Sequence, residues 1–226
     1  VCEYSDSLHQ KYLNLADIIF CSNELYRGYI HRSTLLYPIN GLSCLTTSPE
    51  IEEDELSFCI KRNKKMDTDL IISFLRECSS IKKCVLHVIG DWKKKESFIQ
   101  DVLNIGINVV DHKDLTNQNQ IQEVFDECNY GLNIIKYDGI NSEALDYMCG
   151  QIPIINSVQG DLKQYCELWD IGKNIDIHNY KTIAKTICEE NKNIQLKRRE
   201  NVHNLYNTYF AVEKFFEILD KSGGSL

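Results

Sequence analysis

The sequence predicts an α/β fold in which helices cover a parallel β-sheet. Short apolar runs alternate with longer stretches whose apolar residues recur at helical spacing. Most of these runs show no alternation with polar residues, as expected for strands that are buried on both faces. The chain has 226 residues, of which 43% are hydrophobic, and a chain of this length can bury a substantial core. This composition therefore disfavours a disordered chain.

The expected elements alternate along the chain. Strands are expected at residues 17–21, 34–37, 56–60, 84–89, 108–110, 131–135 and 152–156. Helices are expected at residues 68–77, 95–104, 118–127, 143–148 and 162–168, and from residue 180 onward the chain is expected to be helical. Near the end, Tyr209, Val212, Phe216 and Leu219 are predicted to fall on one helical face. This order predicts a Rossmann-like domain with a helical carboxyl terminus.

A domain boundary is expected near residue 40. Pro38, Gly41 and Pro49 fall in one stretch with the composition of a loop. Residues 1–40 supply too few elements for a domain, so we expect them to be the tail of a preceding α/β domain plus a linker. Residues 41–226 are expected to form the Rossmann-like domain with its carboxyl-terminal helices. The chain begins at Val1 rather than Met, which suggests a piece of a longer protein.

Charge and cysteine content disfavour several classes of protein. A net charge of -8 opposes a nucleic-acid-binding surface. We found no apolar run long enough to span a membrane and no signal peptide, which predicts a cytoplasmic protein. The ten cysteines are spread along the chain without a CxxC pattern. They are expected to be reduced and buried, with one reactive thiol or a metal site as the alternative.

A basic loop follows the expected strand at residues 56–60. It contains Lys61, Arg62 and Lys65. Ligands bind at the carboxyl ends of strands in open parallel sheets, and cations beside a helix amino terminus can hold a diphosphate. The alternative is a solvated surface loop. Asp67 and Asp69 follow in a DxD pattern, for which capping of the next helix is favoured over metal binding.

Two further loops carry candidate ligand-binding residues. Gly90 lies in a Gly-Asp turn after the expected strand at residues 84–89, where glycine permits a ligand to approach the backbone closely. His112 follows the expected strand at residues 108–110 and is a candidate for the border of a base-binding slot. An ordinary loop is the alternative for His112.

The most informative stretch joins an expected strand to a helix that begins near Glu143. Its candidate binding residues are Asp138, Gly139, Ile140, Asn141, Ser142, Glu143 and Asp146. Gly139 permits tight backbone approach, and Asn141 or Ser142 can cap the helix, so its amino terminus can attract an anion. Glu143 and Asp146 lie three residues apart and share a helix face. Alternatively, they only complement the helix dipole.

The order of these segments resembles the donor half of two-domain, GT-B-type glycosyltransferases. It is most similar to the bacterial family 4 group that builds capsular or other cell-surface polysaccharides. The matching residues are Asp146 and Tyr147, then residues 153–156, then Gly160 and Asp161, then Ile171 and Gly172. In addition, Asp138 and Asp146 have the spacing of an acidic pair found in the wider superfamily. The resemblance covers residues 17–219.

The resemblance implies transfer of a sugar from a nucleotide diphosphate sugar to a polysaccharide or lipid-linked acceptor. It implies no obligatory metal and no cofactor beyond the donor substrate. Lys61 would help Arg62 and Lys65, the expected catalytic residues, to neutralise the leaving diphosphate. Glu143 and Asp146 would bind ribose or sugar hydroxyls. An amino-terminal acceptor half or a partner chain is also implied, as is a location in the cytoplasm or at the inner face of the membrane.

Two departures from the family pattern support a rival hypothesis. Gln151 stands where the family has glycine, and Glu143 stands where it has lysine. These departures favour a non-catalytic GT-B-like module that binds a nucleotide or a partner enzyme and modulates it. The preserved segments favour the enzyme. A flavodoxin-like or other nucleotide-binding α/β domain fits the periodicity but not those segments.

Overall fold

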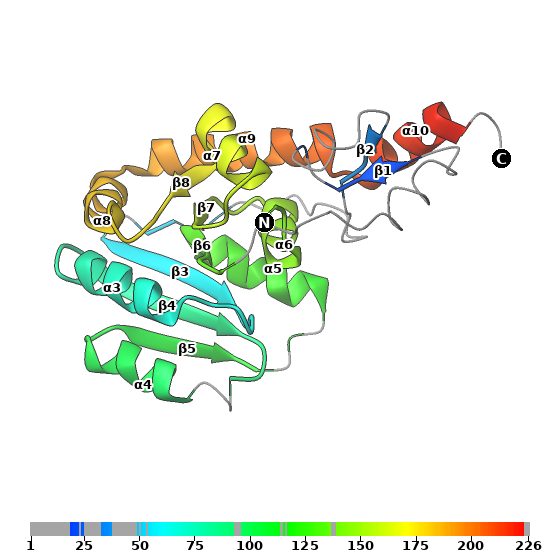
Figure 1. Cartoon of the computed structure of the whole chain (residues 1–226). Helices are drawn as coiled ribbons and strands as arrows, with labels where there is room; N and C mark the ends of the chain where they lie inside the picture. The colour runs from blue at the N-terminus through cyan, green and yellow to red at the C-terminus, as the bar shows by residue number, and fades with distance from the viewer. Residues whose placement is uncertain are drawn as a thin grey trace.

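The computed structural model contains a six-stranded parallel sheet. It describes residues 19–22, 24, 33–37, 49, 51–52, 54–92, 96–113, 115, 117–136 and 139–223. The strands of the sheet are β3 (Glu55–Lys61), β4 (Lys83–Ile89), β5 (Asn108–His112), β6 (Tyr130–Asn133), β7 (Ile154–Asn156) and β8 (Gly172–Asn174). Their order is β5-β4-β3-β6-β7-β8, which is the Rossmann order. The predicted Rossmann-like α/β fold is confirmed (Figure 1).

The helices form two layers. They are α3 (Thr68–Ser79), α4 (Glu96–Asn104), α5 (Gln118–Glu127), α6 (Ser142–Cys149), α7 (Asp161–Trp169), α8 (Tyr180–Glu189), α9 (Lys192–Tyr209) and α10 (Val212–Gly223). From β3 the chain winds outward through β4 to β5, and from β6 it winds the opposite way through β7 to β8. Right-handed crossovers therefore place α3 and α4 on one face and α6 and α7 on the other. Consistent with this, α3 packs on α8, and α9 packs on α6 and α7.

Apolar strands and helix faces fill the core as the sequence predicts. The central strand β3 is buried along its length, with Leu56 and Phe58 fully buried. Gly131 in β6 lies directly under the ring of Tyr147 from α6, and a Cβ atom at this glycine would lie 2.7 Å from the ring. The ring of Tyr147 therefore needs a glycine at position 131. The hydroxyl of Tyr147 lies at the end of β3, where it accepts a hydrogen bond from the Lys61 amide.

The described amino-terminal residues contact the carboxyl-terminal part of the chain. β1 (Phe20–Cys21) and β2 (Thr34–Leu35) form a separate parallel pair. The ring of Tyr37 lies 5.0 Å from that of Phe210, and the Tyr37 hydroxyl donates to Asp161 at 2.9 Å. Figure 1 shows α9 running toward this pair and α10 lying beside it. The predicted boundary near residue 40 lies outside the described residues, so the domain division stays a prediction.

Three element predictions needed correction. The apolar residues predicted on one face belong to two helices, since α9 ends at Tyr209 and α10 begins at Val212. Phe216 in α10 is 56% exposed. The strand predicted at residues 131–135 leaves the ladder at Asn133, and Ile135 forms an isolated antiparallel bridge with Met66. The edge strand β8 was not predicted, because its three residues contain no apolar run.

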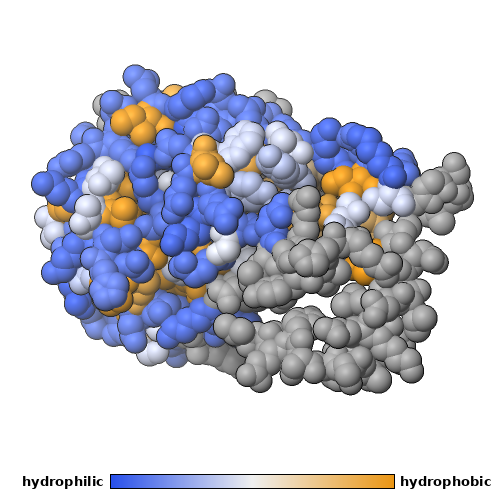
Figure 2. Space-filling view, turned by 45° about the horizontal axis from the view of Figure 1, so that its top comes forward, coloured by the Kyte–Doolittle hydropathy of each residue, from blue (hydrophilic) through white to orange (hydrophobic). Residues whose placement is uncertain are grey.

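The described residues have a mostly hydrophilic face (Figure 2) and buried cysteines. The face in Figure 2 is mostly hydrophilic, with separate small apolar patches. Isolated patches of this kind are normal on folded proteins.

The eight described cysteines are all unpaired and buried, which confirms the prediction of reduced thiols for them; Cys2 and Cys44 lie outside the described residues. Within the described part of the chain, no helix combines the length and apolar character that a bilayer span requires.

Candidate functional site

The strand order places a topological switch point at β3 and β6, and we call the carboxyl-terminal edge of the sheet at this point the crevice. The two strands are hydrogen-bonded neighbours, but the chain leaves them in opposite directions to form the two halves of the sheet. At such a point the loops that follow the strands diverge, and ligands bind outside the carboxyl ends of the strands. β3 ends at Lys61, the loop after it carries Arg62 and Lys65, and the loop after β6 leads to Asn141 and Ser142. The fold therefore brings the two predicted groups of residues to one edge.

The two loops are fastened to each other by backbone contacts. Met66 and Ile135 form the isolated bridge. Beside it, the Asp67 amide donates to the carbonyl of Ile134 at 3.1 Å, and the Lys136 amide donates to the carbonyl of Lys65 at 2.8 Å. These contacts fix the position of the basic loop relative to the amino terminus of α6.

Lys61 and Asp146 form an ion pair across the crevice. The Lys61 amide also donates to the hydroxyl of Tyr147 at 2.9 Å. Tyr147 is fully buried beside Gly131, so this contact anchors the end of β3 on α6. The structure thus places Lys61 and Asp146 in direct contact, and the charge of Lys61 is balanced by this carboxylate.

Glu143 reaches the same loop through Asn63. The Asn63 amide group donates to Glu143 Oε1 at 2.8 Å, and the Asn141 amide group donates to Glu143 Oε2 at 2.8 Å. Burial raises the pKa of Glu143, but the hydrogen bonds outweigh this effect and hold the pKa below its usual range. Glu143 is therefore ionised at neutral pH. Glu143 and Asp146 both face the β3–α3 loop, as their three-residue spacing predicts.

Arg62, Gly90 and His112 lie next to one another on the other side of the crevice. The Arg62 amide donates to the carbonyl of Ile89 at 3.1 Å, and the Gly90 amide lies 3.5 Å from the carbonyl of His112. Gly90 has a φ of +101°, and a Cβ there would lie 3.5 Å from Arg62 Cβ. Among the described residues, no carboxylate pairs with the Arg62 guanidinium. Arg62 is therefore an available cation.

His112 is held by a second histidine that the sequence did not single out. His112 Nε2 lies 3.0 Å from His87 Nδ1, and the two rings stack with their centroids 5.2 Å apart. Burial lowers the pKa of His87 to about 4; His112 adds to this shift and Glu55 opposes it. His87 is therefore neutral at pH 7, and one nitrogen of His112 is already engaged with it.

The turn before α6 leaves the amino terminus of this helix without a side-chain cap from Asn141. Gly139 has a φ of +91°, and its amide donates to the carbonyl of Gln159 at 3.1 Å. Ile140 is buried, and Ser142 is exposed as the first helical residue. Asn141 occupies the amino-cap position but makes no side-chain cap hydrogen bond. Asp138 lies outside the described residues.

Asn141 does not cap the helix because its side chain belongs to a network of asparagines. Its amide group donates to Asn133 Oδ1 at 2.8 Å. Asn133 donates to Asn156 Oδ1 at 3.2 Å, and Asn156 donates to Asn174 Oδ1 at 2.9 Å. Asn133, Asn156 and Asn174 are direct register partners at the ends of β6, β7 and β8. The recurrence of asparagine at each strand end was the missed signal in the sequence.

The DxD pattern is a helix cap in this structure. Asp67 is the amino cap of α3, and its Oδ1 accepts from the Leu70 amide at 3.3 Å. Its other oxygen lies 3.5 Å from Lys136 Nζ. Asp69 lies in the first turn, where a carboxylate complements the helix dipole. No cluster of three or more His, Cys, Asp or Glu side chains suited to a metal ion occurs among the described residues.

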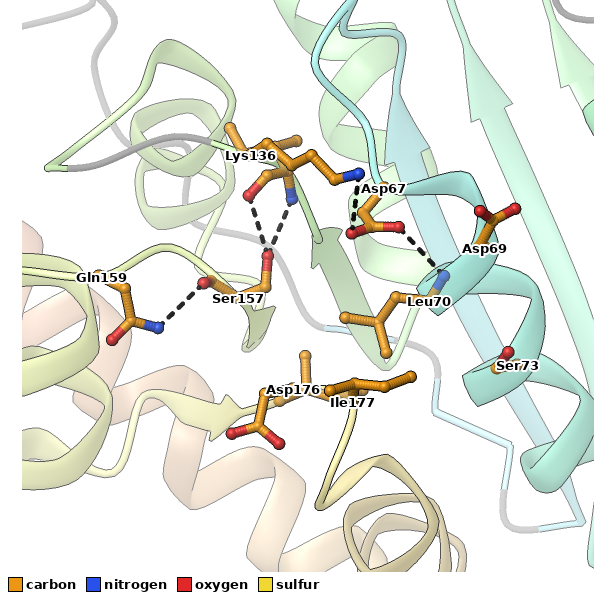
Figure 3. A pocket seen from close by; sticks show the side chains of 11 residues that line it. Asp67, Asp69, Leu70, Ser73, Lys136, Ser157, Gln159, Asp176 and Ile177 are labelled. Carbon is orange, nitrogen blue, oxygen red and sulfur yellow. Dashed lines mark hydrogen bonds and ion pairs between the residues drawn. The ribbon is translucent and has the colours of Figure 1, made fainter.

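Two of the cavities formed by the described residues lie near this edge of the sheet. A cavity of about 40 Å³ lies between α5 and α6 beside Lys61 and Asp146. It is smaller than the roughly 300 Å³ at which small-molecule sites begin, so it is too small to enclose a ligand of this kind by itself. The second cavity has a volume of about 690 Å³ and lies between α3 and the segment after β8 (Figure 3). We call it the edge pocket.

The fold is similar to that of several solved glycosyltransferases. S. aureus TarM in complex with fondaparinux, alpha-GlcNAc-glycerol and UDP superposes with a TM-score of 0.70 at 14% identity. Anabaena HepE in complex with UDP and glucose gives 0.71 at 12% identity, and WaaG, a glycosyltransferase involved in lipopolysaccharide biosynthesis, gives 0.64 at 14% identity. These neighbours are GT-B glycosyltransferases. The chain has the fold of a GT-B Rossmann-like domain.

The chain corresponds to only part of these GT-B proteins. The matches cover 99%, 96% and 86% of this chain, but 49% of TarM, 66% of HepE and 57% of WaaG. No protein-family model matches the chain, and no curated protein sequence matches it. The resemblance to GT-B proteins noted in the sequence is thus confirmed through the fold, while membership of family 4 stays a prediction.

Proposed function

We propose that this chain is the donor-binding half of a metal-independent glycosyltransferase. In this proposal it binds a nucleotide diphosphate sugar and contributes to transfer of the sugar to a polysaccharide or lipid-linked acceptor. The crevice between β3 and β6 carries the proposal, because Arg62 follows β3 and the amino terminus of α6, which has no side-chain cap from Asn141, follows β6. The GT-B fold adds support, since structures with this fold contain UDP.

The diphosphate is proposed to lie between Arg62 and the first turn of α6. A guanidinium makes strong charge-assisted hydrogen bonds to phosphate, and the amide groups of a helix start attract anions. Lys65 extends the positive charge on the same loop. Lys61 joins them only if it exchanges Asp146 for the diphosphate. This exchange would leave the Asp146 carboxylate available to accept hydrogen bonds from ribose hydroxyls.

The ion pair between Lys61 and Asp146 also favours the second candidate function. In the structure these two expected donor-binding groups satisfy each other, and Glu143 is occupied by Asn63 and Asn141. A module that uses the fold only to contact and modulate a partner enzyme would keep this arrangement. Such a module need not bind a nucleotide diphosphate at the crevice.

Calorimetric titration with nucleoside diphosphates distinguishes the two functions. UDP is the first probe because it is present in the related structures, and GDP, ADP and CDP complete the panel. We expect at least one of them to bind. Arg62→Ala should weaken that binding by about 1 to 3 kcal/mol, because a charge-assisted contact would be lost.

Arg76→Ala provides the matched control. Arg76 is an exposed arginine in the last turn of α3, far along that helix from the crevice, so its replacement should leave the affinity unchanged. Equal affinities for the Arg62→Ala and wild-type chains would remove Arg62 from the site. Failure of every diphosphate to bind would favour the partner-binding module.

A further inference from the structure

The edge pocket contains none of the residues assigned to the donor. α3 contributes Asp69, Leu70 and Ser73, and the segment after β8 contributes Asp176 and Ile177 (Figure 3). Its volume of about 690 Å³ falls within the range of about 300 to 1,000 Å³ that is typical of small-molecule sites. The pocket is therefore large enough for a ligand of its own.

Two polar side chains at the pocket are available to a ligand. Asp69 and Ser73 lie four residues apart and thus on one face of α3. Neither side chain has a hydrogen-bond or ion-pair partner in the part of the chain that the structure describes. By contrast, Asp67 is occupied as a helix cap and by Lys136, and the carboxylate of Asp176 accepts from two backbone amides.

Apolar side chains complete the lining. Leu70, Ile135 and Ile175 are buried around the pocket, whereas Ile177 at its border is 63% exposed. Small-molecule sites combine an apolar lining with a few placed polar groups. A sugar ring presents C–H groups that suit such a lining and hydroxyls that can donate to a carboxylate. The apolar lining of the pocket therefore suits the C–H groups of a sugar ring, and its available polar groups suit the hydroxyls.

The charge of the pocket disfavours a phosphate. Asp67, Asp69 and Asp176 contribute three carboxylates, against the single ammonium group of Lys136. Like charges at close range repel a phosphate-bearing ligand. The diphosphate of a donor is thus expected to stay on the side of the crevice where Arg62 lies.

The edge pocket nevertheless lies next to the proposed diphosphate site, because a residue that lines it contacts the turn before α6. Gln159 lines the pocket, and its carbonyl accepts from the Gly139 amide at 3.1 Å. Gly139 belongs to the turn that opens α6, where the diphosphate is proposed to bind. The Met66–Ile135 bridge runs between the pocket and the basic loop. A ligand in the pocket would therefore lie close to the donor without overlapping its phosphates.

We infer that the edge pocket binds an uncharged, hydroxyl-rich sugar residue of the acceptor, with Asp69 and Ser73 as its polar contacts. The inference rests on the proposed function and adds to it a substrate class, a neutral glycan, and a second subsite. The Asp69 carboxylate accepts hydrogen bonds from sugar hydroxyls, Ser73 donates or accepts one, and Ile177 covers the ring.

Saturation-transfer NMR on the 226-residue chain tests this inference. The probes are cellobiose, lactose and N,N′-diacetylchitobiose as neutral sugars, glucosamine as a cationic sugar and glucose 6-phosphate as an anionic sugar. We expect a signal from at least one neutral disaccharide and a weaker or absent signal from glucose 6-phosphate. The doubly substituted chain Asp69→Asn, Ser73→Ala should lose at least about fivefold in affinity for that disaccharide.

Asp101→Asn is the matched control, because Asp101 is exposed on α4 and lies outside the edge pocket. It should leave sugar binding unchanged, and neither variant should alter the affinity for UDP. The inference is overturned if none of the neutral sugars binds, if the double variant binds them as tightly as the wild type does, or if either charged sugar is preferred. UDP binding that depends on Arg62 would still support the proposed function in those cases. Absence of diphosphate binding would instead contradict the proposed function.

Discussion

Asp146 and Glu143 lie where the proposed donor would place its hydroxyl groups, yet both already have protein partners. Lys61 pairs with Asp146, and Asn63 and Asn141 donate to Glu143. The hydrogen bonds that lower the pKa of Glu143 keep this carboxylate ionised. A diphosphate can approach two carboxylates only if cations outweigh them locally. This requirement makes Arg62, which has no carboxylate partner among the described residues, the most informative residue to replace.

His87 should make the stability of the fold depend on pH between about 6.5 and 4. Its pKa in the folded chain is about 4, below its ordinary value of 6.5, because it is buried beside His112. In this window the unfolded chain binds more protons than the folded chain, so the free energy of unfolding falls as the pH falls. We expect a loss of roughly 2 to 3 kcal/mol across the window, measured by urea unfolding at several pH values.

A His87→Gln variant separates this contribution from those of other groups. Carboxylates such as Glu143, whose pKa is lowered on folding, lose their contribution only at lower pH. The variant should therefore show a flatter dependence between pH 6.5 and pH 4 than the wild type. Identical slopes for the two chains would show that His87 does not titrate as its buried position requires.

At the scale of elements, the asparagine network joins the ends of β6, β7 and β8. Asn156 is fully buried, and its side chain also bonds to both backbone polar groups of Val158. Asn156→Ala would leave several buried polar groups without partners, each costing about 1 to 3 kcal/mol. We expect the free energy of unfolding to fall by about 2 to 4 kcal/mol in urea titrations.

The matched substitution Asn119→Ala lies on the exposed surface of α5 and should change stability by less than about 0.5 kcal/mol. The network also holds Asn141, the amino cap of α6. Asn156→Ala should therefore weaken diphosphate binding in the chains that remain folded. An Asn156→Ala chain as stable as the Asn119→Ala chain would show that the network contributes little to the fold.

Most elements were predictable because local pattern determines them. The runs that became β3 and β4 are continuously apolar, and α3 and α5 have clear caps and helical spacing. β8 was missed because a strand of three residues with the sequence Gly-Lys-Asn carries no such pattern. It is held as a strand by its backbone bonds to β7, which depend on the assembled sheet rather than on local sequence.

The candidate site was predictable as a list of residues but not as a set of contacts. Sequence position identified Lys61 and Asp146, which are 85 residues apart. Their contact follows from the adjacency of β3 and β6, which β4 and β5 separate along the chain. The pairing of His87 with His112 likewise depends on the register of β4 against β5. Contacts of this kind arise only once the strand order is set.

At the scale of the whole molecule, the chain spans about half of TarM. The amino-terminal residues that the structure describes are tied to the carboxyl-terminal helices by Tyr37, which contacts Phe210 and Asp161. β1 and β2 form a parallel pair outside the main sheet. That the first 40 residues belong to a preceding domain, on which the acceptor would be held, stays a prediction.

We expect the 226-residue chain to bind a donor but to transfer no sugar at a useful rate by itself. Holding donor and acceptor together contributes about 7 to 11 kcal/mol to catalysis. The edge pocket supplies at most one subsite for the acceptor, so most of this contribution should be missing. Transfer is measured with radiolabelled UDP-sugars and with glycan or lipid-linked acceptors.

The positive control is the same transfer assay on a longer native chain, or on this chain together with a partner chain that supplies the acceptor half. We expect transfer to appear in that control and to be lost again with Arg62→Ala, whereas Arg76→Ala should retain it. Robust transfer by the 226-residue chain alone would contradict the division into two halves. The complete acceptor site would then have to be formed by residues of this chain, and the edge pocket beside the turn at Gly139 would be the place to search for it.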